Sequence, residues 1–368
     1  MRICTDFKPF SKTRSDSCST GTNPRFALAA VGLSVALAGC SNDASFNPEP
    51  LESGLTRLNI DPFSITVSGI SSGGYMAQQF HLAHSERVRG VGLIGVGPYD
   101  CAQGQLGRAL SACMGVPSEP FELAPLVGLA LQRAEARDIH TLGNLRNDQV
   151  WMLHGDQDAT VGRPLFDAAV AFYQEFVNAD RITVEYAERT GHLWPTIDYG
   201  VDCASSDSPY LGDCGLDAAE LMLSALYGYL LQPSDNLESL VEFDQRLAGG
   251  EYAEGLGETG YAYIPRDCQD GAPCSLHISL HGCNQHADAI GDTFARHNGL
   301  NRWAETNRIV VLYPQTKASQ ANPMNPQGCW DWWGYTGPDY ATIDGIQIEA
   351  LVHMVNHIAG ISPYDPDA

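Results

Sequence analysis

Lysine is almost absent from this sequence, where it occurs only at Lys8, Lys12 and Lys317. Asp and Glu number 44 against 21 Lys and Arg, so the formal net charge at pH 7 is -23. Proteins that bind nucleic acid need a basic surface to contact the phosphates. The composition therefore excludes nucleic acid as an expected partner and predicts an acidic, well-solvated surface.

The N-terminal apolar run at 26–38 is too short to span a membrane comfortably as a helix. A basic segment precedes it, and it ends in Leu-Ala-Gly before Cys40. This pattern is typical of a bacterial lipoprotein leader, so we expect residues 1–40 to be a signal peptide with a lipobox. Cys40 would then carry the lipid of an exported protein, and Ser41 favours the outer membrane because a retention-signal aspartate is missing. The alternative is a chance apolar run that ends in cysteine.

No two of the eleven cysteines are spaced as C-x-x-C, and neither a metal ion nor a cofactor is expected. Eight cysteines follow Cys40, and an even number in an exported domain predicts four disulfides. Spacing alone leaves the connectivity open, and some of these residues could instead be free buried thiols. Closeness along the chain favours Cys101–Cys113, Cys203–Cys214 and Cys268–Cys274, which leaves Cys283 with Cys329.

Beyond a polar stretch at 41–54, expected to be a tether, strand-like and helix-like segments alternate. The alternation predicts an α/β fold with a mostly parallel sheet covered by helices on both faces. A polar stretch at 232–238 separates two halves, which we assign to one catalytic domain at 55–368. The expected strands are 64–67, 88–96, 150–153, 182–186, 275–280 and 309–313; the expected helices are 73–85, 123–137 (a candidate lid), 164–178, 217–231, 287–298 and 346–358.

A G-x-S-x-G motif centred on Ser71 lies between the strand at 64–67 and the helix at 73–85. In this setting the motif is typical of a nucleophile elbow, whose strained turn needs small neighbours on both sides of the serine. The helix N-terminus behind the turn favours a developing oxyanion. We therefore expect Ser71 to be the nucleophile. Ser72 is a rival, and a Gly/Ser-rich turn without chemistry is the alternative.

A nucleophilic serine needs a base, and the base needs a carboxylate that orients it. His-Gly-Asp-Gln-Asp at 154–158 follows a strand, and we choose Asp158 as the acid because it lies deeper in the loop. Asp156 is expected to cap the turn instead. His192 follows the next strand and is the expected base.

The oxyanion hole normally combines the amide after the nucleophile with an amide from a loop that follows an earlier strand. No such strand precedes Ser71 here. Leu-His-Gly-Cys-Asn-Gln at 280–285 fits the role, although it lies far downstream. We therefore expect a circularly permuted α/β-hydrolase fold in which the amides of Ser72 and Cys283 form the oxyanion hole. A disulfide from Cys283 to Cys329 would fix this loop.

Three tryptophans fall within four residues at 330–333. Aromatic side chains are most often buried, so core packing is one interpretation. The other is that Trp332 or Trp333 is exposed beside the active site, where it offers a flat apolar surface to an ester chain.

These motifs resemble those of extracellular polyhydroxybutyrate depolymerases, over nearly all of residues 55–360. In its permuted order the chain is similar to the single-domain, fungal-type branch of that family. The resemblance implies a triad of Ser71, Asp158 and His192, oxyanion amides from Ser72 and Cys283, and a tryptophan in the substrate cleft. The segments that carry it are 69–75, 154–158, 191–194, 280–285 and 328–333.

The leading functional hypothesis is a serine esterase that hydrolyses a 3-hydroxybutyrate polyester or its oligomers through an acyl-enzyme. The chain ends at Ala368 without a separate polymer-binding domain, which favours soluble or amorphous material. One alternative is a feruloyl or acetyl-xylan type carboxylesterase, whose relatives share the His-Gly-Cys loop in unpermuted order. A second alternative is a non-catalytic surface-binding lipoprotein.

Overall fold

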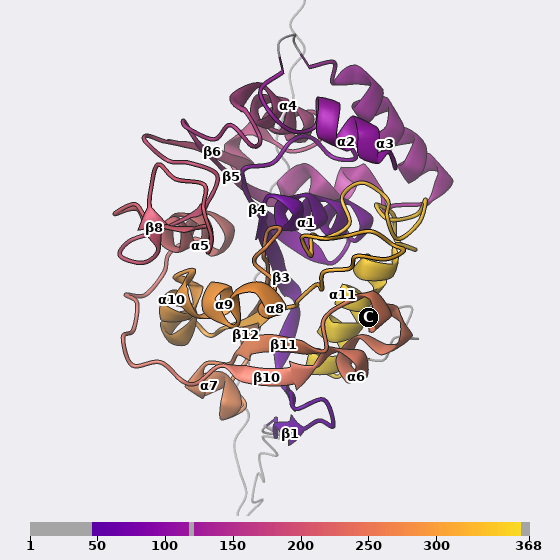
Figure 1. The fold of residues 1–368 in the computed structure, drawn as a ribbon. Helices are drawn as coiled ribbons and strands as arrows, with labels where there is room; N and C mark the ends of the chain where they lie inside the picture. The colour runs from indigo at the N-terminus through magenta and orange to yellow at the C-terminus, as the bar shows by residue number, and fades with distance from the viewer. Residues whose placement is uncertain (1–45, 118–120, 362–368) are drawn as a thin grey trace, which may run out of the picture. The chain divides into compact units, whose positions relative to one another are not determined.

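One eight-stranded sheet carries all six predicted strands, each within a segment close to the predicted one (Figure 1). The computed structural model describes residues 46–117 and 121–361, so the expected signal peptide and Cys40 lie outside the described residues. Both halves of the sequence contribute strands, and the polar stretch at 232–238 therefore does not divide the sheet. Across the sheet the strands are β10 (Val241–Asp244), β11 (Thr259–Tyr263), β13 (Ile309–Tyr313), β12 (Cys274–Leu280), β3 (Ile60–Ile70), β4 (Val88–Ile94), β5 (Gln149–Gly155) and β6 (Ile182–Ala187).

The pairing in this sheet is parallel from β13 through to β6. Only β10 and β11 pair in the antiparallel sense, at the edge beside β13. Because β3 lies between β12 and β4, the first long strand of the sequence occupies the middle of the sheet. Figure 1 shows this placement as indigo β3 among orange elements from the second half of the chain.

Helices cover both faces of the sheet, as predicted, and each face has its own apolar core. Neighbouring residues of a strand point to opposite faces. In β5, Met152 belongs to one core, whereas Trp151 and Leu153 belong to the other. The first core is shared with α1 (Ser72–Ala83), α4 (Arg163–Gln174) and α11 (Ile346–Ala359), and the second with α5 (Ala218–Tyr227), α9 (Thr293–His297) and α10 (Leu300–Asn307).

The folded part of the chain begins earlier than the boundary predicted at residue 55. Strand β1 (Glu49–Pro50) pairs with β2 (Thr56–Arg57), and Ser53 between them is buried. The Ser53 hydroxyl forms a 2.8 Å hydrogen bond with Nε2 of His357 in α11. The expectation of a free tether as far as residue 54 is therefore wrong for this hairpin, because its backbone and a buried hydroxyl are bound to the domain.

Two further sequence expectations differ from the structure. The predicted helix 287–298 is two short helices, α8 (Ala287–Ile290) and α9, because Gly291 has a φ of 64° between them. The edge strands β10 and β11 and the helices α2 (Leu106–Ala112) and α10 were not predicted. The remaining elements are β7 (Trp194–Thr196), β8 (Val201–Asp202), β9 (Leu211–Asp213), α3 (Ala124–Ala136), α6 (Gln245–Gly249), α7 (Arg266–Gln269), and the 3-10 helices Leu142–Asn147, Ala179–Arg181 and Gly250–Gly255.

The described residues form four disulfides, and all four expected pairs are confirmed: Cys101–Cys113, Cys203–Cys214, Cys268–Cys274 and Cys283–Cys329. The first three close short loops, whereas the fourth joins the loop after β12 to the aromatic segment 46 residues later. Within the described part of the chain, no helix is both long and apolar enough to cross a membrane.

Candidate active site

Ser71 lies in the tight turn that leads from the central strand β3 into helix α1. Its backbone has a φ of 54° and a ψ of -124°, a conformation that non-glycine residues rarely adopt. The turn is held by hydrogen bonds from Ser71 N to Ile94 O (3.0 Å) and from Tyr75 N to Ser71 O (2.9 Å). A strained serine between a strand and a helix is the geometry that the G-x-S-x-G motif predicts.

Two glycines of the motif are required by close backbone contacts. A Cβ atom on Gly69 would lie 2.3 Å from the carbonyl carbon and oxygen of Gly73. A Cβ atom on Gly73 would lie 2.3 Å from the carbonyl oxygens of Leu280 and His281. The start of α1 therefore lies directly against the end of β12, where the loop at 281–285 begins.

The predicted acid and base are in contact. Oδ2 of Asp158 lies 2.7 Å from Nδ1 of His192, and Oδ1 accepts hydrogen bonds from the amides of Thr160 and Val161, both at 2.9 Å. Burial alone would raise the pKa of Asp158, but the charge and hydrogen bond of His192, together with the Val161 amide, hold this pKa below its ordinary value. Asp158 is therefore ionised and fixed, as an orienting carboxylate must be.

Asp156, the other carboxylate of this loop, has the turn role that was expected of it. Its Oδ1 accepts a 3.3 Å hydrogen bond from the backbone amide of Thr190, and its side chain is exposed. The structure thus separates the two candidate acids by contact, since Asp158 is the one bonded to His192.

His192 shares a cavity with Ser71. Both residues line a space of about 190 Å³, together with Gly282 and Cys283 of the loop after β12. The backbone amide of His192 donates to the hydroxyl of Ser206 at 2.8 Å, which fixes the residue from behind. Nε2 of His192 is buried and has no hydrogen-bond partner among the described residues, so it is free to accept a proton.

The two amides expected to form the oxyanion hole belong to residues on this same cleft. Ser71, Ser72 and Cys283 all line a second, more apolar space of about 400 Å³. Neither the amide of Ser72 nor that of Cys283 donates a hydrogen bond to another described residue. Both donors are therefore available to a substrate oxygen, and the Cys283–Cys329 disulfide fixes the second of them.

His281 and Gln285 anchor the loop that carries Cys283. Burial lowers the pKa of His281 to about 3, so its ring is neutral at ordinary pH. Its Nε2 accepts the Thr316 amide at 3.2 Å, which leaves the ring hydrogen on Nδ1, where it donates to Gly282 O at 2.7 Å. Oε1 of Gln285 accepts the Gly282 amide at 2.7 Å. The Gly282 backbone is thus bound through both its carbonyl and its amide.

Gln285 also connects this loop to the segment that follows His192. Its Nε2 donates to the carbonyl oxygens of Pro209 (2.9 Å) and Tyr210 (3.2 Å). Neither Gln285 nor Ser206 was singled out from the sequence, because their roles depend on backbone groups that only the fold brings near. The glutamine does end the 280–285 motif, which was the available signal.

Both interpretations hold in part. Trp330 and Trp332 are buried, as core packing predicts, yet Trp332 and the half-buried Trp333 line the 400 Å³ cavity beside Ser71. The Trp332 ring is 6% exposed and stacks on Tyr75 with 4.9 Å between ring centroids. The other wall of this cavity includes Leu106, Leu110 and Met114, which come from the unpredicted helix α2 and the residues just after it.

Asp331 shapes the loop that presents these rings. Its buried carboxylate accepts hydrogen bonds from four successive backbone amides and from one hydroxyl; the donors are the amides of Trp333, Gly334, Tyr335 and Thr336 and Oγ1 of Thr336. A single buried side chain thus fixes the backbone that carries Trp332 and Trp333.

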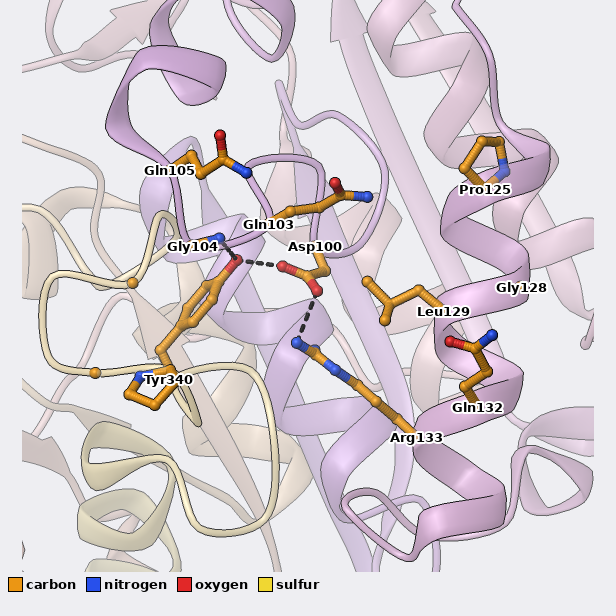
Figure 2. Close-up of a pocket in the computed structure, with 13 residues that line it drawn as sticks. Asp100, Gln103, Gly104, Gln105, Pro125, Gly128, Leu129, Gln132, Arg133 and Tyr340 are labelled. Atoms are coloured by element: carbon orange, nitrogen blue, oxygen red, sulfur yellow. Dashed lines mark hydrogen bonds and ion pairs between the residues drawn. The ribbon is translucent and has the colours of Figure 1, made fainter.

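A larger cavity, of about 870 Å³, adjoins the other side of the same loop, at Gly334 and Tyr340 (Figure 2). Figure 2 shows Arg133 of α3 and Tyr340 of the loop approaching Asp100 from two sides. The guanidinium of Arg133 lies 2.8 Å from Asp100, and the Tyr340 hydroxyl donates to the same carboxylate. The helix predicted as a candidate lid is thus α3, which lines this polar cavity and does not line the two cavities at Ser71.

Comparison with known proteins gives consistent matches along the chain. The chain is 36% identical over 356 residues to a poly(3-hydroxybutyrate) depolymerase of Delftia acidovorans, which covers 92% of this chain and 68% of that protein. It is also 36% identical over 323 residues to a polyhydroxybutyrate depolymerase of Talaromyces funiculosus. That match covers 83% of this chain and 92% of the relative. No family model matches the chain.

Two solved structures share the fold over most of the chain. One is the PHB depolymerase from Penicillium funiculosum, with a TM-score of 0.77, 33% identity and coverage of 83% of this chain and 98% of that one. The other is a serine-to-alanine variant of a PHB depolymerase complexed with an R3HB trimer, with a TM-score of 0.78, the same identity and the same coverage. The predicted α/β-hydrolase fold class and the family resemblance are both confirmed.

We predict that Gln285→Ala lowers kcat for ester hydrolysis by about 10-fold to 100-fold and changes KM much less. The reason is that Gln285 holds the Gly282–Cys283 backbone in place, and a misplaced oxyanion donor weakens the transition state more than the ground state. Steady-state kinetics on a soluble ester measure the effect. Gln105→Ala, at the polar cavity, is the matched control. A Gln285→Ala enzyme with wild-type kcat would contradict the positioning role.

Proposed function

This chain belongs to the polyhydroxybutyrate depolymerase family, and on that premise we propose that it hydrolyses a 3-hydroxybutyrate polyester or its oligomers at Ser71. The observation that carries the proposal is the cavity shared by Ser71 and His192, in which His192 is bonded to Asp158. The adjoining apolar space, walled by Trp332 and Trp333, has the character expected for an aliphatic ester chain. The R3HB trimer bound to a relative supports the same substrate class.

In the proposed mechanism, Nε2 of His192 takes the proton of the Ser71 hydroxyl as Oγ attacks the ester carbonyl. The carbonyl oxygen becomes an oxyanion that accepts hydrogen bonds from the amides of Ser72 and Cys283. His192 then gives the proton to the leaving ester oxygen as the ester bond breaks, and the rest of the substrate departs as an alcohol. Water then attacks the acyl-enzyme while His192 takes its proton. His192 returns this proton to Oγ of Ser71 as the acyl–Oγ bond breaks and a hydroxyacid is released.

We also infer that the fold is circularly permuted. In α/β-hydrolases the loop with the second oxyanion donor follows a strand that comes before the nucleophile in the sequence. Here that loop follows β12, which is late in the sequence yet pairs in parallel with β3. The neighbouring strands in space are therefore those expected of the fold, and only their order along the chain differs.

Export and lipid attachment are proposed for the N-terminal segment, as residues 1–40 acting as a leader and Cys40 as the anchor. Four disulfides support folding in an oxidising compartment. We propose that the anchored protein is held at the outer membrane, on either its periplasmic or its cell-surface face.

We predict that Ser71→Ala or His192→Ala lowers turnover of hydroxybutyrate oligomers by at least about three orders of magnitude, with an unchanged circular dichroism spectrum. The two carboxylates provide a matched pair. Asp158→Asn should lose turnover by about four orders of magnitude, because the His192 ring loses its fixed tautomer. Asp156→Asn, which keeps an acceptor for Thr190, should stay within a few-fold of wild type. Equal losses in both Asp variants would refute the assignment of Asp158.

We predict that the wild-type rate rises from hydroxybutyrate dimer to longer oligomers, since binding along the apolar wall assists the reaction at Ser71. Trp333→Ala should lower oligomer hydrolysis by about 10-fold or more and should change hydrolysis of a short activated ester by less than about three-fold. Tyr229→Ala, at a ring that is 90% exposed, is the control. An enzyme that ignores these oligomers and rapidly cleaves feruloyl or acetyl esters would establish the wall-esterase alternative instead.

We predict that a Cys40→Ala protein incorporates no labelled fatty acid and leaves the membrane fraction, because the proposed lipobox directs the lipid to Cys40. The wild-type protein, expressed in the same bacterial host, should label and sediment with membranes. Membrane association and processing equal to wild type in the variant would show that residues 37–40 are not a lipobox.

A further inference from the structure

A second cluster of reactive side chains lies at the far end of the nucleophile helix. His84 caps the C-terminus of α1, and Glu86 follows it in the turn before β4. His140 comes from the segment between α3 and β5, where its backbone amide donates to Ala83 O at 3.3 Å. Among the described residues, these three form the one group of potential metal ligands whose ligand atoms all lie within 4.8 Å of one another.

The spacing in this cluster suits a shared ion. Nδ1 of His84 lies 3.4 Å from Oε1 of Glu86, at the long limit of a hydrogen bond, and Nδ1 of His140 lies 3.1 Å from Oε2. Ligands that bind zinc tetrahedrally at about 2.0–2.1 Å lie about 3.3 Å apart. Oε2 of Glu86 is buried and accepts no hydrogen bond from the described residues, despite its closeness to His140. The two atoms are therefore near each other without the geometry of a hydrogen bond.

The surroundings are also compatible with a cation. The last carbonyl groups of α1 give its C-terminus a partial negative charge. Glu349 of α11 is close enough to His84 to interact with it electrostatically. Two arginines lie nearby, and neither guanidinium donates a hydrogen bond to the Glu86 carboxylate. Arg87, which interacts electrostatically with Glu86, donates to Asn356 at 2.7 Å, and Arg89 donates to the backbone carbonyl of Glu86 at 2.8 Å.

We propose that His84, Glu86 and His140 bind one zinc ion, with water completing the coordination. Two imidazoles and one carboxylate are a known zinc ligand set, whereas calcium and magnesium prefer oxygen ligands alone. The sequence did not predict this site, because His140 is remote from the other two residues along the chain. The ion would join the end of α1 to the segment before β5, and it would stabilise the fold from a position separate from Ser71.

Isothermal titration of the purified, tag-free protein with ZnCl₂, after removal of metal by a chelator, tests the proposal. One equivalent of zinc should bind, and the midpoint of thermal unfolding should rise by about 2–4 °C at saturation. His140→Ala and Glu86→Gln should each weaken binding at least about tenfold and lose the thermal shift. His297→Gln should keep both, because that histidine stacks on Tyr199 outside the cluster.

The active-site histidine needs its own control, because an imidazole in a cavity can also bind zinc. His192→Ala should retain the equivalent of zinc and the thermal shift. Loss of zinc binding in His192→Ala with retention in His140→Ala would place the ion at the active site and overturn the proposal. So would the absence of binding at micromolar zinc, which would leave an ion-paired cluster without a metal. Ester hydrolysis by the chelator-treated enzyme should match wild type.

Discussion

The contact of Gly73 with the carbonyl groups of Leu280 and His281 is the constraint on which the active site depends. With no Cβ at Gly73, the start of α1 comes close enough to β12 for the nucleophile turn and the loop after β12 to line one cleft. A methyl group at this position would have to displace backbone in a central parallel sheet, where close packing leaves little room to shift. The closeness of the Ser71 turn to the loop that carries Cys283 therefore depends on a residue without a side chain.

This contact joins residues that are far apart in the sequence, so closing it costs chain entropy that other interactions must offset. Parallel pairing of β12 with β3 provides the main support. The Cys283–Cys329 disulfide restricts the unfolded chain, and Gln285 ties the loop to Pro209 and Tyr210. The chemistry requires neighbours in space, and the sheet provides them although β12 comes long after β3 in the sequence.

The sequence allowed us to predict those site residues that directly follow a strand. Ser71, Asp158 and His192 each follow a parallel strand, and such strands end at one edge of the sheet, so their order alone indicated a shared site. What could not be predicted depends on contacts between segments. Strand β10 is four residues long, and helix α2 is seven, too short for periodicity to show. Likewise, the fold alone brings Gln285 near Pro209 and Tyr210, whose carbonyl oxygens it binds.

The loop that carries the tryptophans has two faces. Hydrogen bonds to the buried carboxylate of Asp331 hold together the segment from Trp333 to Thr336. One face lines the cleft beside Ser71, and the other, through Gly334 and Tyr340, lines the polar cavity that contains the Asp100–Arg133 pair. The cleft beside Ser71 and the polar cavity therefore share one loop, and Tyr340, which donates to Asp100, connects the far end of that loop to the polar cavity.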